Sequence, residues 1–268
     1  MYYNKEQIMK VTIFTSNSIR HKFFANSISK LVDETLVICE TRKNDAIEIE
    51  SDNQISGIEK HFLERFQVEK EEFKGNDYFL AKTIPLEYKE VNLKYVSNVV
   101  GNFSPDVMLV FGSSIIHDEL ISLAKKDRFL NLHLGLSPYY RGSGTNFWPF
   151  VNNELEYLGS TILHLDRGID TGDIVTHVRP KIVENDNVHT IGCKIIKESV
   201  NAFKKIFQSV SNGTELERIK QWDPSIKRYY KNIDFTEDKL REYMNNLENG
   251  IVKKYVESEK KEIKLIGI

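Results

Sequence analysis

The chain has 268 residues, of which 40% are hydrophobic and 28% are charged, and its formal net charge at pH 7 is −2. This balance excludes a disordered chain and gives no bulk attraction for nucleic acid, and the length allows one large domain with a small appendage. No apolar run reaches the roughly 18 residues that span a bilayer, and the segment MYYNKEQIMK lacks the apolar core of a signal peptide, so we expect a cytoplasmic protein with neither membrane nor nucleic acid as partner.

The first half of the chain alternates strand and helix patterns. Apolar and β-branched runs predict strands at residues 10–16, 34–40, 105–112 and 129–135. Helical patterns lie between them, including a helix expected over 84–103 that Gly101 ends, and a short helix after residue 112. Strands separated by helices of this length form right-handed βαβ units, so the pattern predicts a mostly parallel sheet with helices on both faces.

Residues 42–78 interrupt this alternation. The segment is charged and contains HFLERFQVEKEEF, in which Phe62, Phe66 and Phe73 lie near helical spacing. We interpret it as an inserted helix with a loop at each end. The alternative is an ordinary crossover helix with a solvated charged face.

The pattern changes again after Gly142. Segments 157–166 and 173–183 alternate like antiparallel strands, and a long helix follows. A boundary near residues 212–217 predicts two parts, a domain over 1–212 and a small α+β appendage over 213–268. The appendage carries a helical stripe, which suggests a homodimer, made of Leu240, Tyr243, Met244 and Leu247.

Two polar residues stand side by side in the apolar strand at 129–135. Asn131 and His133 are two positions apart, so their side chains point to the same face of the sheet. They also lie near the carboxyl end of a parallel strand, where open α/β sheets bind ligands. Burying both groups costs free energy unless each finds a partner. The pair is therefore either a satisfied detail of the core or a reactive site.

A second polar loop, LDRGIDTGD, follows one strand later and contains Asp166, Asp170 and Asp173. It is open to three interpretations: a plain hairpin turn, a metal loop with His164 and Asp166 as ligands, or a source of one functional carboxylate. No third ligand has suitable spacing, so we expect no metal. The two cysteines, Cys39 and Cys193, lack zinc spacing as well and are interpreted as buried thiols.

The remaining motifs narrow the chemistry. RGSGTNF over 141–147 fits neither the dinucleotide fingerprint nor a P-loop, and no serine or cysteine occupies a nucleophile elbow. An amide, an imidazole and a carboxylate are left. Without a covalent intermediate they suit direct acyl transfer, in which the amide stabilises an oxyanion and the other two groups move protons.

The segments NLHLGLSPYYRG and GSTILHLDRGIDTGDIV together resemble the formyltransferase family, over roughly residues 10–210. They contain, in order, the family's Asn-x-His, its Pro-x-Tyr-x-Gly turn, its Gly-Ser-Thr-Ile-x-His strand and its Ile-Asp-x-Gly loop. The resemblance implies a Rossmann-like fold and transfer of a formyl group from 10-formyltetrahydrofolate to an amine. It also implies that the catalytic residues are Asn131, His133 and Asp170.

The resemblance extends to the ligand pockets. It implies that Ser114, Ile115 and Ile116 lie against the pteridine, with the loop containing Asp166 and Gly168 on its other side. Two departures stand out: His-Leu-Gly replaces the family's frequent His-Pro-Ser, and the first βα turn is not glycine-rich. In that turn, a substrate phosphate near a helix start would meet Ser16, Asn17 and Arg20.

Among members of the family, this chain is most similar to the sugar N-formyltransferases, which act on nucleotide-linked amino sugars for surface polysaccharides. The loop expected to stack on a base and contact the acceptor contains Tyr139, Tyr140, Arg141, Phe147 and Trp148. A methionyl-tRNA formyltransferase-like enzyme and transfer to another small amine are the alternatives within the family. Outside it, a folate- or nucleotide-binding module and a nicotinamide-dependent enzyme are the alternatives, although the latter lacks the glycine fingerprint.

Overall fold

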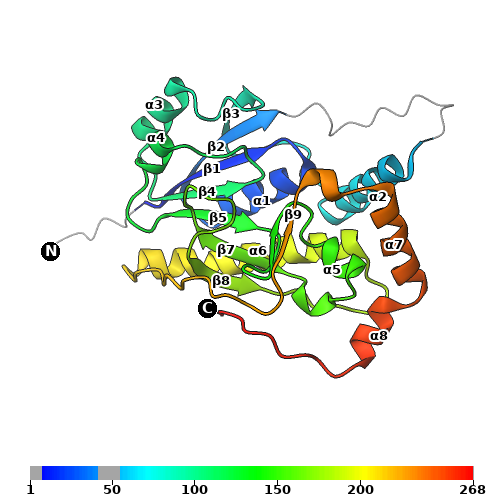
Figure 1. Cartoon of the computed structure of the whole chain (residues 1–268). Helices are drawn as coiled ribbons and strands as arrows, with labels where there is room; N and C mark the ends of the chain where they lie inside the picture. Colours follow the sequence, from blue (N-terminus) through cyan, green and yellow to red (C-terminus); the bar gives the residue numbers. More distant parts are fainter. Residues whose placement is uncertain (1–7, 42–54, 268) are drawn as a thin grey trace.

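A computed structural model describes residues 8–41 and 55–267. Its centre is a seven-stranded sheet with the order β3-β2-β1-β4-β5-β7-β8 (Figure 1). The strands are β1 Lys10–Ser16, β2 Glu34–Thr41, β3 Lys82–Glu87, β4 Val107–Phe111, β5 Phe129–His133, β7 Ser160–His164 and β8 Ile174–Val178. β1 to β5 are parallel, and β7 and β8 run antiparallel to their neighbours. The fold is the Rossmann-like α/β fold that the sequence predicts.

Helices cover both faces of this sheet. The α-helices of the described residues are α1 Ile19–Ser29, α2 Gly57–Glu72, α3 Lys94–Phe103, α4 Asp118–Ile121, α5 Trp148–Val151, α6 Val188–Ser211, α7 Glu237–Glu248 and α8 Ile251–Glu257. Of these, α7 packs on α5 and α2, and α8 on α7. Alternating residues of β1 point to opposite faces: Ile13 joins a core with Phe24 of α1 and Phe203 of α6, and Phe14 joins a core with Val100 of α3. Both faces of the sheet are therefore packed against apolar side chains and shielded from water.

The helix expected over 84–103 is wrong in its first half. Residues 82–87 form the edge strand β3, and α3 begins only at Lys94. Pairing with β2 decides the conformation, and an edge strand tolerates Pro85, which has no amide N–H to donate. The helix also runs past Gly101 and ends at Ser104, which has φ 53°.

The helix expected in this segment is present as α2, but it connects the adjacent parallel strands β2 and β3, so it is the ordinary crossover helix of the alternative interpretation, with a largely exposed face. Ser56 begins it with a capping box, in which its hydroxyl accepts the Glu59 amide while the Glu59 carboxylate accepts the Ser56 amide. Phe73, just after the helix, is buried and stacks on Phe23 of α1 with ring centroids 4.4 Å apart. The first expected loop falls mostly on residues 42–54, which lie outside the described residues.

The segment after α6 returns to the main body. β9 Arg228–Tyr230 pairs in parallel with the short strand β6 Tyr140–Gly142. From the stripe on α7, Leu240 and Tyr243 are buried in one cluster with Phe150 of α5, whereas Met244 is 47% exposed. Part of the stripe is thus covered within one chain, and the homodimer and the division at residue 212 stay predictions. No helix in the described ranges has the length and apolarity of a membrane span.

Candidate active site

Asn131 and His133 lie at the carboxyl end of β5, and Asp170 reaches them from the loop between β7 and β8. The Asn131 amide Nδ2 donates to Asp170 Oδ1 over 3.2 Å. The other carboxylate oxygen, Oδ2, lies 3.2 Å from His133 Nδ1 and accepts the Gly142 amide N–H over 3.3 Å. The His133 and Asp170 side chains are 6% and 11% exposed. The three residues therefore form one connected, nearly buried polar cluster.

The second ring nitrogen of His133 also faces an acceptor. Nε2 lies 3.0 Å from the carbonyl oxygen of Tyr140. A neutral imidazole has one N–H and can donate to one of these two acceptors, whereas the protonated ring donates to both. Each ring nitrogen therefore faces an oxygen acceptor, and these contacts fix the orientation of the imidazole.

The backbone of Asp170 is held in an unusual conformation. Its φ of 53° lies in the left-handed region, which residues other than glycine rarely adopt. The side-chain amide of Gln221 donates to the carbonyl of Asp170 over 2.8 Å and to that of Gly172 over 2.9 Å. Strained residues of this kind persist where the surroundings fix them. Gln221 is such a constraint, and no motif in the sequence pointed to it.

The two segments that the family resemblance places around the pteridine lie beside each other. Asp118, just after Ser114–Ile115–Ile116, forms an ion pair of 2.7 Å with Arg167 of the second segment. Asp166 accepts hydrogen bonds from the Gly168 amide and the Thr171 hydroxyl, which shape that loop. The first segment is shaped by Glu40, which the sequence analysis missed: its buried carboxylate accepts the Ser114 amide N–H over 2.6 Å.

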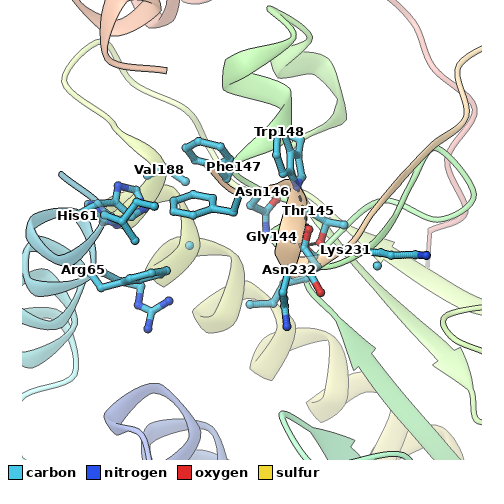
Figure 2. Close-up of a pocket in the computed structure, with 18 of the residues that line it drawn as sticks. His61, Arg65, Gly144, Thr145, Asn146, Phe147, Trp148, Val188, Lys231 and Asn232 are labelled. Carbon is cyan, nitrogen blue, oxygen red and sulfur yellow. Dashed lines mark hydrogen bonds between the residues drawn. The ribbon is translucent and has the colours of Figure 1, made fainter. Parts of the chain in front are cut away.

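A cavity of about 630 Å³ opens next to the cluster, with His133 in its lining (Figure 2). Three residues of the expected substrate set line it: Arg20 from α1, Phe147 just before α5, and Trp148 from α5. The Trp148 ring is stacked on Tyr230, with centroids 4.0 Å apart and planes at 10°. Its indole N–H donates to the Ser143 carbonyl over 2.9 Å, so its orientation is fixed.

The other expected substrate residues do not line this cavity. Tyr139 and Tyr140 are buried, and their hydroxyls donate to the Lys264 carbonyl and the Glu154 carboxylate. Ser16 is buried too, with its hydroxyl 2.6 Å from His21 Nδ1. Arg141 lies on β6, and Asn17 precedes α1. The structure therefore brings Arg20, Phe147 and Trp148, but not the two tyrosines, to the cavity.

The cavity also contains residues that no sequence motif identified. His61 and Arg65 come from α2, His189 from the first turn of α6, and Lys231 and Asn232 from the segment after β9. Burial, with a smaller contribution from Arg65, lowers the pKa of His61 to about 4. Burial and the neighbouring His61 lower the pKa of His189 to about 3. Both rings are therefore neutral near pH 7.

The metal interpretation of the 165–173 loop finds no support in the geometry. His164 uses Nε2 on the Glu217 carbonyl at 2.9 Å, and Asp166 is engaged by Thr171. Within residues 8–41 and 55–267, no group of three or more His, Cys, Asp and Glu side chains is placed to hold a metal ion. Both cysteines are buried, and burial raises the pKa of the Cys193 thiol to about 12.

The similarity to known proteins extends over the residues of the seven-stranded sheet and of the polar cluster. Residues 10–206 match the model of the formyl transferase family. A methionyl-tRNA formyltransferase of Clostridioides difficile is 29% identical over 163 residues, which are 57% of this chain and 50% of the relative. The chain thus spans about half the length of the curated relatives it matches.

Two solved structures are similar over most of the chain. The sugar 3N-formyltransferase WlaRD, solved with dTDP and 5-N-formyl-THF, is 25% identical with a TM-score of 0.52, covering 86% of this chain and 72% of its own. An N-formyltransferase of Helicobacter canadensis, in complex with folinic acid and dTDP-3-aminofucose, is 21% identical with a TM-score of 0.54, covering 89% and 80%. The second likeness concerns the fold alone.

Proposed function

The chain belongs to the formyl transferase family, and from that premise we propose that it transfers the formyl group of 10-formyltetrahydrofolate to the amine of a nucleotide-linked amino sugar. The observation that carries the proposal is the cluster of Asn131, His133 and Asp170 beside a cavity of about 630 Å³. A binding protein does not need a carboxylate shared between an amide and an imidazole. A direct acyl transfer does.

The roles of the three residues follow from their atoms. When bound, 10-formyltetrahydrofolate supplies the formyl carbon that the acceptor amine attacks. The Asn131 amide has two N–H groups, of which Asp170 uses one, so the other can stabilise the oxygen that gains negative charge. Asp170 takes the proton that the amine loses. His133 delivers a proton to the folate nitrogen as its bond to the formyl carbon breaks.

The segments 114–116 and 166–170 suit a flat heterocycle. Ile115 is 62% exposed and Ile169 is 48% exposed, although both are large and apolar. They come from the two segments that the Asp118–Arg167 ion pair joins. Apolar side chains left open beside backbone polar groups are typical of small-molecule sites. We therefore assign the folate to Ser114, Ile115 and Ile116, with Asp166 and Gly168 shaping the opposite side.

The lining of the cavity indicates the chemical class of the acceptor. Its described lining includes Arg20, Arg65 and Lys231 but no aspartate or glutamate, which suits an anionic small molecule. Trp148 lies in the same lining; it is 2% exposed, and one face of its ring is covered by Tyr230. The similarity to WlaRD, at 25% identity, supports a nucleotide-linked sugar. The curated relatives support the second candidate, charged initiator tRNA, but a net charge of −2 is unfavourable for a long phosphate backbone.

One assay separates these acceptors. The protein is given 10-formyltetrahydrofolate with either a UDP- or dTDP-linked amino sugar or charged initiator tRNA, at about 150 mM salt so that non-specific phosphate contacts are screened. Release of tetrahydrofolate is measured. We expect turnover with an amino sugar and none with tRNA. Formylation of tRNA alone would contradict the sugar assignment, and folate binding without turnover of any amine would favour a binding module.

A further inference from the structure

One wall of the cavity is built by three helices and is rich in nitrogen. We call it the basic wall, and it consists of Arg20 of α1, His61 and Arg65 of α2, and His189 of α6. Figure 2 shows His61 and Arg65 on α2, across the cavity from Lys231 and Asn232. The wall thus depends on α2, the helix that connects the adjacent strands β2 and β3.

Two guanidinium groups of the basic wall share one buried carboxylate. Arg20 and Arg65 both pair with Oε1 of Glu69, which is buried, and the Arg65 distance is 3.8 Å. One carboxylate therefore faces two guanidinium groups. Arg65 also lies over the Phe62 ring, with its Cζ 4.7 Å from the centroid, which orients its planar fork. An anion bound in the cavity would form a favourable charge interaction with these partly buried guanidinium groups.

His189 provides an independent sign of a ligand. It is 6% exposed, and its Nε2 is buried with no hydrogen-bond partner among the described residues. Its ring lies 4.5 Å from that of His61. Buried polar atoms in folded proteins nearly always have partners, so an unpartnered nitrogen in a cavity wall indicates an atom that binds there. A neutral imidazole N–H is a good donor to a phosphate oxygen.

We propose that the basic wall binds the diphosphate of the acceptor, with Arg20 and Arg65 as charged donors and His189 as a neutral donor. The inference rests on the proposed function for the identity of the acceptor. His133 and the basic wall line the same cavity, so a ligand with its amine at His133 extends its anionic part toward α2. Because His61 and His189 are buried, the wall suits a small anion better than a polymer backbone. α2 is then a specificity element.

Calorimetric titration of the full chain with UDP, dTDP and uridine tests this assignment. We expect UDP or dTDP to bind at least about tenfold more tightly than uridine, and more weakly as salt increases. Arg65→Gln should weaken that binding roughly 10- to 100-fold, the effect of losing a charge-assisted contact, and Arg65→Lys should weaken it less. His189→Phe keeps an aromatic ring and removes both ring nitrogens, including the unpartnered Nε2, so it should weaken binding without lowering the Tm. Lys204→Gln, an exposed cation on α6, is the matched control and should change nothing.

The outcomes separate the subsite from the reaction. Equal binding of uridine and UDP, or unchanged UDP and dTDP affinity in Arg65→Gln and His189→Phe, would overturn the subsite. If an amino sugar is still formylated, the proposed function survives that result. Conversely, nucleotide binding that depends on Arg65, in a protein that formylates no amino sugar, would support the subsite and contradict the function. With an active acceptor, Arg65→Lys should raise its KM and leave kcat and the folate KM unchanged.

Discussion

Asp170 Oδ2 lies 3.2 Å from His133 Nδ1, although the imidazole belongs to a parallel strand and the carboxylate to the loop of an antiparallel hairpin. The antiparallel pairing of β5 with β7 sets Asn131 opposite Leu163 and His133 opposite Thr161, so β7 ends beside the start of β5. The loop that follows folds back along β5 and places the Asp170 carboxylate against both side chains. The hydrogen bond from Gln221 to the Asp170 carbonyl then fixes the backbone that carries this carboxylate. Geometry within the cluster therefore depends on sheet register as much as on the three residues themselves.

Removing either proton-transfer group should abolish most of the activity. We expect His133→Asn and Asp170→Asn each to lower kcat by at least about 100-fold, the scale of losing a positioned acid or base. Folate affinity should change little. The control is Asp173→Asn, in the same loop, where the carboxylate pairs with Arg218 instead of the cluster. Wild-type turnover in either test variant would remove that residue from the mechanism.

Glu40 should position the donor site without touching the donor. Its carboxylate accepts the Ser114 and Lys89 amides over 2.6 and 2.8 Å. In Glu40→Gln an NH₂ group replaces one of the two oxygens, so one amide loses its acceptor. We expect the KM for 10-formyltetrahydrofolate to rise about tenfold, with the acceptor KM unchanged. Glu34→Gln, at the exposed start of the same strand, is the control; equal effects of both variants would refute the positioning role.

Gly142 should tolerate no side chain. Its φ is 91°, and a Cβ there would overlap the carbonyl oxygen of Tyr230 in the β6–β9 pair. Its amide also donates to Asp170. We expect Gly142→Ala to lower the free energy of unfolding by roughly 2–4 kcal/mol and to lower turnover.

Gly192 offers the matched comparison for that variant. It also lines the cavity, but it lies within α6 and a Cβ there meets nothing within 4 Å. Gly192→Ala should raise the free energy of unfolding by about 0.5–1 kcal/mol, because alanine has less backbone freedom to lose. Urea denaturation measures both changes; a stable Gly142→Ala protein would show that the β6–β9 contact can shift.

Acid should destabilise the protein partly through His177. Burial lowers its pKa to about 4, from 6.5 in the free side chain. Its Nδ1 accepts the Ile266 amide and its Nε2 faces the Ser137 carbonyl at 2.7 Å, so the folded ring is neutral. Because the folded pKa lies below the unfolded one, its contribution is complete above pH 6.5 and is lost as the pH falls toward 4.

This loss can be isolated by substitution. Between about pH 7 and about pH 5, titration of this one ring should cost about 2 kcal/mol of unfolding free energy. His177→Asn keeps an acceptor for Ile266 but does not titrate in this range. Its urea-unfolding free energy should therefore fall less steeply with pH than that of the wild type. Parallel pH profiles would show that His177 is not responsible.

Elements with strong local patterns were predictable from the sequence. The apolar runs identified the parallel strands, and the two-residue spacing of Asn131 and His133 put both side chains on one face, because side-chain direction along a strand alternates. The helix over 84–103 failed in its first half because pairing with β2 overrode a local pattern. Hydrophobic periodicity reflects neighbours within one helix or strand. It carries no information about which distant strand the segment pairs with.

What the sequence by itself determined is therefore the sheet, its helices and the family to which the motifs belong. Only the tertiary structure decided which buried ring lies in the cavity wall: Tyr139, Tyr140 and Trp148 are all at most 5% exposed and have the same apolar signature in sequence, but only Trp148 lines the cavity. Only the tertiary structure brings Arg65 of α2 and His189 of α6 to the wall of one cavity. Such contacts form when separate helices pack against one sheet, so their distances depend on the whole core and leave no local trace in the chain.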